Sequence, residues 1–225
     1  MAAEKDPEGF YSDQFHNLAN FEGHKHQTGP EIYEQLEGNL DIFIAGAGTG
    51  GTIAGVSHYL KSQNPSIKVF LADPQGSSLH MKVKYGTLFS SREKEGHKEK
   101  MPFRTMVEGV GLLWLAKNFD QALIDDSVKV SDQQAYDMAR FLLRKEGLFV
   151  GSSSALHIFA ACKVALTQPK GTRILTLICD DGGRHLSKFY EKSFWDNRGM
   201  GLIERSNEEI DSLEFLLGSG VDKRK

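Results

Sequence analysis

The sequence predicts an α/β fold in which helices flank a mostly parallel sheet. The first observation is that three apolar runs each stop at a cluster of glycine or serine residues. The second is that helical patterns separate these runs, as in LDIFIAGAGTGGTIAGVSHYL at residues 40–60. Because parallel strands cannot be joined by a tight turn, strands that alternate with helices are typical of a parallel sheet. The repeated alternation therefore predicts one layered core.

Composition excludes several classes of protein. With 40% hydrophobic and 25% charged residues, the chain has the make-up of an ordinary globular protein. A net charge of −3 gives no reason to expect a nucleic-acid partner, and no apolar run approaches the ~18 residues of a membrane span. Cys162 and Cys179 have neither metal-binding nor redox spacing, which is typical of free thiols in a reducing compartment. Without a signal-peptide pattern, the sequence predicts a cytoplasmic protein.

The first part of the chain is predicted to contain a βαβ unit. Residues 1–27 are polar and have no clear period, so we expect an irregular segment, followed by a short helix that Thr28 caps. Residues 41–45 and 67–74 are apolar runs and are predicted strands. Between them, Thr52–Gln63 has a helical pattern that ends before a proline.

A second helix is predicted in the middle of the chain, after a weakly patterned segment. Residues 76–105 are charged and are expected to form a long surface excursion. Val130–Gly147 has the clearest helical pattern, with Ser131 as N-cap and Gln134 in position to complete a capping box. The predicted buried face consists of Ala135, Met138, Ala139, Leu142 and Leu143.

Two further strand-and-turn patterns follow. Residues 148–166 predict a short strand, a serine-rich turn and a helix, and residues 172–185 predict a third strand that ends in a glycine turn. The carboxyl ends of parallel strands share one edge of a sheet, where ligands bind in open α/β folds. We therefore expect all three turns to meet at one edge.

The first turn has the composition of a phosphate-binding loop. Its glycines let backbone N–H groups approach an anion, and the helix that starts at Thr52 adds unpaired N–H donors. Which phosphate it binds stays open. The G-x-G-x-x-G pattern from Gly46 matches the dinucleotide fingerprint, with Asp73 as the ribose-binding acid. The hydroxyl groups of Thr49 and Thr52 favour a compact monophosphate instead. A structural turn without a ligand is the third interpretation.

The other candidate residues carry weaker signals. The serines of Ser152–Ser154 could cap the following helix or face a ligand. Asp180 or Asp181 could cap the following turn. Cys179 has no evident base partner that would make it a nucleophile. The histidines of GHKH at residues 23–26 have no third ligand at a suitable spacing, so no metal site is predicted.

Five segments resemble, in the same order, those of the cysteine synthase and cystathionine β-synthase family of pyridoxal-phosphate enzymes. GAGTGGTIAG at residues 46–55 resembles the family's phosphate-binding loop, and EGLFVGSSSA at 146–155 resembles the segment whose serine hydrogen-bonds the pyridine nitrogen. The other three are DQFHNLANFEGHKHQTGPEIYEQL at residues 13–36, VEGVG at 107–111 and CDDGGRHLSKF at 179–189. The last segment is similar to a cysteine-synthase-like subgroup.

This resemblance implies a tryptophan-synthase-β-like fold that binds pyridoxal 5′-phosphate. It implies cysteine-synthase-like β-replacement on O-acetylserine or serine, in which sulfide yields cysteine, and it implies a small amino-acid substrate. Ser153 is the implied partner of the ring nitrogen. The implied phosphate-binding residues are Gly48, Thr49, Gly50, Gly51 and Thr52.

The resemblance also implies that the fold is incomplete. The family's Schiff-base lysine lies in an N-terminal motif close to Ser-x-Lys-x-Arg, and no lysine of this sequence has that context. We therefore expect an N-terminally truncated chain without that lysine, and we assign no catalytic residue. The expected division is an irregular segment at 1–27, a partial cofactor-binding α/β domain at 28–200 and a peripheral tail at 201–225.

Two alternatives to cysteine-synthase-like activity stay open. One is a dinucleotide-binding oxidoreductase module, and the other is a non-catalytic partner of a full-length homologue. We expect either a homodimer or association with such a homologue. The family's subgroup makes the mitochondrion an alternative to the cytoplasm.

Overall fold

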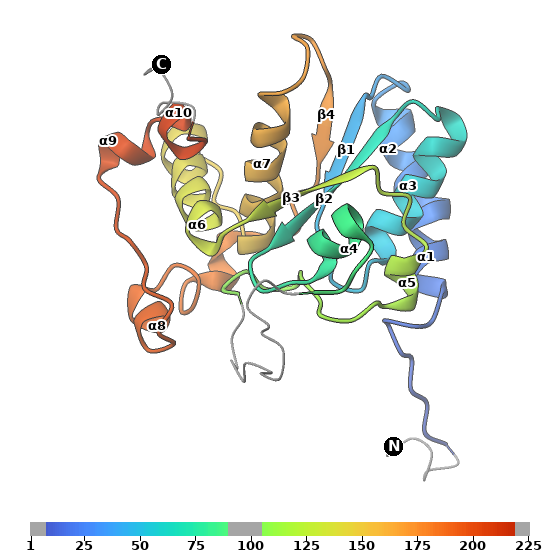
Figure 1. Ribbon diagram of the computed structural model, residues 1–225, viewed down its shortest axis with the longest axis horizontal. Helices are drawn as coiled ribbons and strands as arrows, with labels where there is room; N and C mark the ends of the chain where they lie inside the picture. The colour runs from blue at the N-terminus through green and yellow to red at the C-terminus, as the bar shows by residue number, and fades with distance from the viewer. Residues whose placement is uncertain (1–7, 90–104, 219–225) are drawn as a thin grey trace.

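The chain folds around a four-stranded parallel sheet with strand order β3-β2-β1-β4, seen in a computed structural model that describes residues 8–89 and 105–218 (Figure 1). The predicted α/β class and parallel sheet are confirmed. The strands are β1 Ile42–Ala45, β2 Lys68–Pro74, β3 Asp126–Val130 and β4 Ile174–Thr176. The helices are α1 Ala19–Gly23, α2 Gly29–Gln35, α3 Gly51–Gln63, α4 Leu79–Tyr85, α5 Lys117–Asp120, α6 Asp132–Phe141, α7 Ser152–Ala165, α8 Lys192–Asp196, α9 Asn207–Ile210 and α10 Leu213–Leu216.

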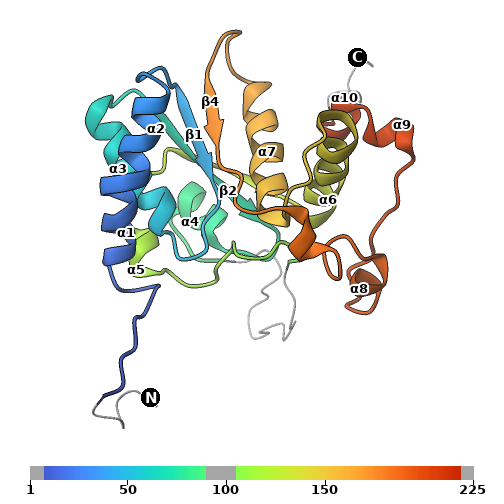
Figure 2. The ribbon, with the colours of Figure 1, turned by 180° about the vertical axis from the view of Figure 1, so that it is seen from behind.

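Helices cover both faces of the sheet, as the front and back views show (Figure 2). Successive side chains of β1 point to opposite faces, and all of them are buried. Ile42 and Ile44 pack in the core that contains α6 and α7. Phe43 and Ala45 pack in the second core, which contains α2 and α3. The continuous apolar run therefore reflects a strand that is buried on both sides.

The order of the strands places a crevice beside β1. Helix α3 leads from β1 to β2 on one side, whereas β4, later in the chain, pairs with the other side of β1. From β1, the chain therefore adds β2 and β3 on one side and then returns to add β4 on the other. In open α/β sheets, ligands bind beyond the carboxyl ends of the strands at such a switch point.

The predicted βαβ unit and the predicted middle helix are confirmed. Helix α3 begins one residue before the predicted Thr52, directly after Gly50 at φ +87°. At the start of α6, Ser131 and Gln134 form the expected capping box, with bonds of 3.2 and 2.9 Å. The helix continues in a π-helical turn and stops at Gly147, which has φ +69°. Leu143 is an exception to the predicted buried face, since 43% of it is exposed.

The expected irregular segment at 1–27 is wrong from Ala19 onward. Helices α1 and α2 are joined by a π-helical turn at His24–Thr28 into one helical stretch. Thr28 has helical φ and ψ angles and does not act as the N-cap. The helices form because packing on α3 stabilises them. Phe21 is buried, and its carbonyl oxygen approaches Gly55 of α3 so closely that a Cβ on Gly55 would lie 2.5 Å from that oxygen.

Three further elements differ from the sequence-based expectations. Strand β3 was not predicted, and α4 lies in the segment expected to be a surface excursion; residues 90–104 of that segment lie outside the described residues. The predicted strand at 148–150 is only an isolated antiparallel bridge between Val150 and Asp181. Short elements such as these are selected by their neighbours more than by their own pattern.

The C-terminal segment packs on the core. Leu202, Ile210, Leu216 and Leu217 are buried, although a peripheral tail was expected from residue 201. Lys163 of α7 donates to the carbonyl of Leu217 at 2.7 Å. The proposed division of the chain into a segment, a domain and a tail stays a prediction. Within residues 8–89 and 105–218, no helix is long and apolar enough to cross a membrane.

Candidate functional site

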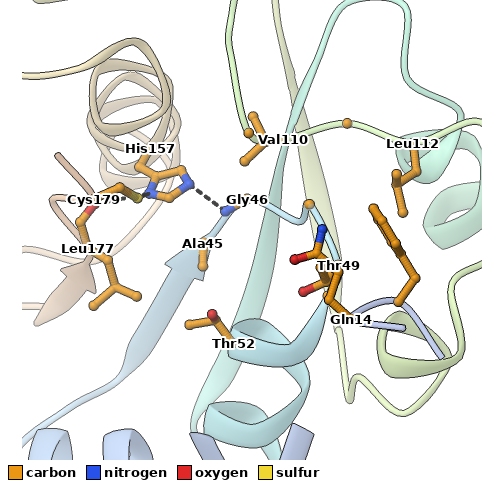
Figure 3. Close-up of a pocket in the computed structure, with 15 residues that line it drawn as sticks. Gln14, Ala45, Gly46, Thr49, Thr52, Val110, Leu112, His157, Leu177 and Cys179 are labelled. Carbon is orange, nitrogen blue, oxygen red and sulfur yellow. Dashed lines mark hydrogen bonds between the residues drawn. The ribbon is translucent and has the colours of Figure 1, made fainter. Parts of the chain in front are cut away.

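A cavity of about 580 Å³ opens at the carboxyl ends of β1 and β4, at the switch point of the sheet (Figure 3). The loop after β1 forms one wall, and the segment at 109–112 forms another. The lining residues include Gln14, Phe15, Gly46, Gly48, Thr49, Gly50, Thr52, Val110, Leu112, His157, Leu177 and Cys179. Of the predicted phosphate-binding residues, all but Gly51 line this cavity.

The loop after β1 is packed so closely that its glycines cannot be replaced without movement. A Cβ on Gly48 would lie 2.2 Å from the carbonyl oxygen of Gly109. A Cβ on Gly50 would lie 2.4 Å from the Cα of Phe119, and the φ of +87° adds strain for any other residue. Gly51 is buried behind the loop, where a Cβ would lie 2.0 Å from Asn20 Oδ1. Each glycine thus serves the packing of the loop.

The hydroxyls of Thr49 in the loop and Thr52 in α3 contact side chains of the N-terminal helical stretch. Thr49 Oγ1 accepts hydrogen bonds from Asn20 Nδ2 at 2.9 Å and from the N–H of Gly51 at 3.3 Å. Both bonds use the oxygen as an acceptor, which leaves the O–H to donate. Thr52 Oγ1 lies 3.1 Å from Nε2 of His24. Burial lowers the pKa of His24, so this imidazole is neutral at pH 7.

A buried histidine holds the first residue of the loop. His157 Nε2 accepts from the N–H of Gly46 at 2.7 Å, and Nδ1 donates to the carbonyl of Leu177 at 3.0 Å. Burial lowers the pKa of His157, which agrees with the neutral tautomer that this pattern requires. No sequence pattern predicted a role for this residue. The sequence feature that could have indicated it is a polar side chain inside the otherwise apolar run ALHIFAA at residues 155–161.

The three serines at the start of α7 bind different parts of the site. Ser152 Oγ accepts from the N–H of Glu108 at 3.0 Å, and Ser154 Oγ accepts from the N–H of Cys179 at 2.8 Å. Ser153 faces a second hollow of about 420 Å³. This hollow shares Gly109, Val110 and Cys179 with the first cavity. The structure therefore places Ser153 next to the cavity, while its two neighbours fix the walls.

Cys179 lies between the two hollows, and burial raises the pKa of its thiol, an effect that a hydrogen bond with Ser153 partly offsets. A protonated thiol is a poor nucleophile, and the Nδ1 of His157 that lies 3.8 Å from its Sγ donates to the carbonyl of Leu177, so the geometry gives no support to a nucleophilic role. The next residue, Asp180, pairs with the buried His185 at 2.8 Å. Asp181 accepts from the N–H of Gly183 at 2.7 Å and caps the following turn, as predicted.

Asp73 and His26 lie outside the cavity lining. The Asp73 carboxylate is 1% exposed and accepts from Lys129 Nζ and from the N–H of His80, both at 2.9 Å. This engagement disfavours a ribose-binding role. His26 is exposed and pairs with Glu22 at 3.0 Å. Within the described ranges, no group of three or more His, Cys, Asp or Glu side chains could hold a metal ion.

Comparison with known proteins shows the family of the chain. The family described as pyridoxal-phosphate dependent enzyme matches residues 1–180 of the chain. The chain belongs to this family. Known cysteine synthases are similar to this chain over most of its length. Cysteine synthase 2 of Neurospora crassa is 47% identical over 221 residues, which cover 96% of this chain and 47% of that protein.

Two further proteins support the same family. Cysteine synthase 2 of Schizosaccharomyces pombe is 51% identical over 208 residues, covering 92% of this chain and 52% of the relative. The solved structure of an O-acetylserine dependent cystathionine beta-synthase from Helicobacter pylori matches with a TM-score of 0.70 and 35% identity, covering 83% of this chain and 55% of that chain. The chain therefore spans about half the length of the relatives it matches.

The residues at the site fit the family's cofactor, pyridoxal phosphate. The cavity of about 580 Å³ lies within the ~300–1,000 Å³ that is typical of small-molecule sites. One wall combines the N-terminus of α3 with two threonine hydroxyls, which suits a phosphate dianion. Ser153, whose hydroxyl is neutral and can donate or accept a hydrogen bond, lines the adjoining hollow.

Proposed function

We propose that this chain forms the cofactor-binding part of a cysteine-synthase-like enzyme. Such an enzyme replaces the β-substituent of O-acetylserine or serine with sulfide and so makes cysteine. One observation carries the proposal. The loop after β1, which has the composition of a phosphate-binding loop, lines one hollow, and Ser153 lines the hollow that adjoins it. The relatives named cysteine synthase 2 support the choice of reaction.

In this proposal the two ends of the site have separate tasks. The loop after β1 and the N-terminus of α3 bind the phosphate through backbone N–H groups and hydroxyls. Ser153 binds the ring nitrogen with a neutral hydroxyl. When bound, pyridoxal phosphate supplies an electron sink for the charge that develops at the substrate α-carbon. The residues that would bind the phosphate are Gly48, Thr49, Gly50 and Thr52; Gly51, also expected from the sequence, lies behind the loop and donates its N–H to Thr49 Oγ1.

Equilibrium titration with pyridoxal phosphate tests the cofactor assignment. We expect saturable binding to the full chain, weakened about tenfold in Thr49→Ala and in Ser153→Ala, since each loses one hydrogen bond to the ligand. Thr167→Ala is a matched control, because Thr167 bonds only locally at the end of α7. If the wild-type chain shows no saturable binding, the proposed function is wrong.

Borohydride reduction followed by peptide mapping tests the expectation about the Schiff-base lysine. Reduction of the loaded chain should leave no cofactor on any single lysine if that residue is absent from this sequence. A specific adduct on one lysine would overturn this expectation. Assays of cysteine formation from O-acetylserine and sulfide, with the chain alone and with a full-length homologue, then show whether the chain needs a partner.

Association with a second chain follows as a part of the proposal. Strands β3 and β4 are the edges of the described sheet, and Ile178 and Leu186 beyond β4 are 57% and 58% exposed. Open edges and exposed apolar side chains favour association. Sedimentation at several concentrations should therefore show a homodimer or, in a mixture, a complex with a full-length homologue. A cooperative thermal transition of a strictly monomeric chain would contradict this.

The cytoplasm is the compartment we propose. A Saccharomyces cerevisiae relative that is 47% identical over 200 residues is named a putative mitochondrial cysteine synthase, so the mitochondrion is the alternative. Fractionation of cells that express the protein from its own locus distinguishes the two.

A further inference from the structure

The imidazole of His157 connects β1 and β4 beyond the point where their backbones stop pairing. The last paired residues of these strands are Ile44 and Thr176. Farther along, Gly46 donates its N–H to Nε2 of His157, and Leu177 accepts from Nδ1 of the same ring (Figure 3). The ring thus takes the place of a direct backbone bond, at the level where the two strands border the cavity.

This connection fixes the position of the first residues of the loop after β1. Gly46 is the first residue after β1, and a Cβ there would lie 2.7 Å from His157 Nε2 and 2.9 Å from a methyl group of Val110. The next residue, Ala47, is held by the N–H of Gly111, which donates to its carbonyl at 2.8 Å. The first two residues of the loop, Gly46 and Ala47, are therefore bound in place, so the loop can keep its shape before a ligand arrives.

The connection works in one protonation state. Nε2 must carry a lone pair to accept from Gly46, and Nδ1 must carry the proton that Leu177 accepts. A doubly protonated ring would place an N–H against the N–H of Gly46. His157 is 3% exposed, and among the described residues the titratable side chain in contact with its ring is that of Cys179, whose Sγ lies 3.8 Å from Nδ1. Burial raises the pKa of that thiol, so it stays neutral while the imidazole titrates.

We propose that His157 is a positioning residue for the cofactor phosphate: its neutral ring holds Gly46 and Leu177 apart at a fixed spacing and so presets the loop for the anion. The inference rests on the proposed function, because it takes pyridoxal phosphate as the ligand. It adds His157, which lines the cavity but is not among the residues proposed to bind the phosphate or the ring nitrogen. It also adds a pH dependence, since protonation of His157 removes the acceptor that Gly46 needs. Burial lowers the pKa of His157, so this loss begins below its ordinary range.

Two substitutions separate positioning from packing. His157→Gln keeps a donor and an acceptor but cannot be protonated, whereas His157→Leu fills the space without either. In the full 225-residue chain, pyridoxal phosphate affinity at pH 8 should fall about tenfold in His157→Leu and recover most of that loss in His157→Gln. As the pH falls from 8 to the lowest value at which both proteins stay folded, the wild type should lose affinity more steeply than His157→Gln. The phosphate of the ligand titrates in both proteins, so the difference between the two profiles belongs to His157.

The amide ¹⁵N resonance of Gly46 in the ligand-free chain provides a second measurement. It should shift with pH in the wild type, with the midpoint of His157, and stay constant in His157→Gln. If wild type and His157→Gln have parallel affinity profiles, or if the Gly46 resonance does not titrate, the inference is wrong even where the cofactor binds. These comparisons do not depend on whether His157→Leu folds. If the wild type fails to bind pyridoxal phosphate at pH 8, the proposed function fails and the binding part of this inference fails with it.

Discussion

Asn20 donates its side-chain amide to Thr49 Oγ1 at 2.9 Å, although the two residues are 29 positions apart. The same amide group also donates to the carbonyl of Gln14 at 3.0 Å. A residue of α1 therefore links the segment that lines the cavity to the hydroxyl that we assign to the phosphate. Because the amide supplies the protons, Thr49 is left with its own O–H for a ligand.

Replacing Asn20 with aspartate should weaken cofactor binding. Asn20→Asp turns the donor into a carboxylate, which repels the phosphate and competes for the proton of Thr49. We expect pyridoxal phosphate affinity to fall by a factor on the order of ten to a hundred, measured by fluorescence titration. The control is Asn197→Asp at an exposed position near the end of α8. Equal affinity in wild type and Asn20→Asp would contradict the role of this link.

An added methyl group in the loop should destabilise the fold. Gly48→Ala places a Cβ against the carbonyl of Gly109, and backbone atoms cannot rotate away as a flexible side chain can. We expect the free energy of unfolding to fall by about 1–3 kcal/mol in chemical denaturation. Gly23→Ala is the matched control: nothing lies within 4 Å of its added Cβ, and its φ of −55° is helical. That control should be neutral or stabilising by about 0.4–1 kcal/mol. A Gly48→Ala protein as stable as the control would refute the close packing of the loop.

The buried carboxylate of Asp73 should matter for stability and not for cofactor binding. Asp73→Asn weakens the bonds from Lys129 and from the N–H of His80, so we expect a loss of about 1–3 kcal/mol in the free energy of unfolding. Asp120→Asn at an exposed position is the control. Affinity for pyridoxal phosphate should stay within about twofold in both variants. Binding of reduced nicotinamide dinucleotide that depends on Asp73 would instead revive the dinucleotide interpretation.

His24 should make the fold sensitive to mild acid. Burial lowers its pKa in the folded chain, so below about pH 6.5 the unfolded chain binds the extra proton and the folded chain resists it. The free energy of unfolding should therefore be highest at neutral pH and fall as the pH drops through this window. His24→Gln should reduce the loss of unfolding free energy between pH 7 and pH 5, because the variant has no imidazole to protonate at this position.

His26→Gln is the natural comparison, because His26 lies two residues away, is exposed and pairs with Glu22. Because its side chain is exposed, this variant controls for the loss of one histidine without the loss of a partly buried ring. His80 and His157 also have pKa values that burial lowers, so part of the sensitivity should remain in His24→Gln. Identical pH profiles for wild type and His24→Gln would show that His24 titrates alike in both states.

Local sequence patterns were sufficient to predict the elements that begin or end at capping residues, glycine or proline. The βαβ unit was predictable because β1 is a pure apolar run, Gly50 permits the sharp turn, and a proline follows α3. Helix α6 was predictable because Ser131 and Gln134 satisfy each other's backbone groups within one turn. By contrast, residues 19–28 have no such pattern, and they are helical since Phe21 and its neighbours pack on α3.

The sequence by itself determined the α/β class, the parallel sheet, the glycine loop after β1 and the serine turn before α7. These features depend on residues that are close in the chain, where periodicity, caps and turns act directly. Only the tertiary structure decided that His157 holds Gly46, 111 positions away, and that Asn20 holds Thr49. Both contacts exist because the strand order puts β4 beside β1 and because α1 packs on α3. Pairings between distant segments arise from packing, and no local pattern encodes them.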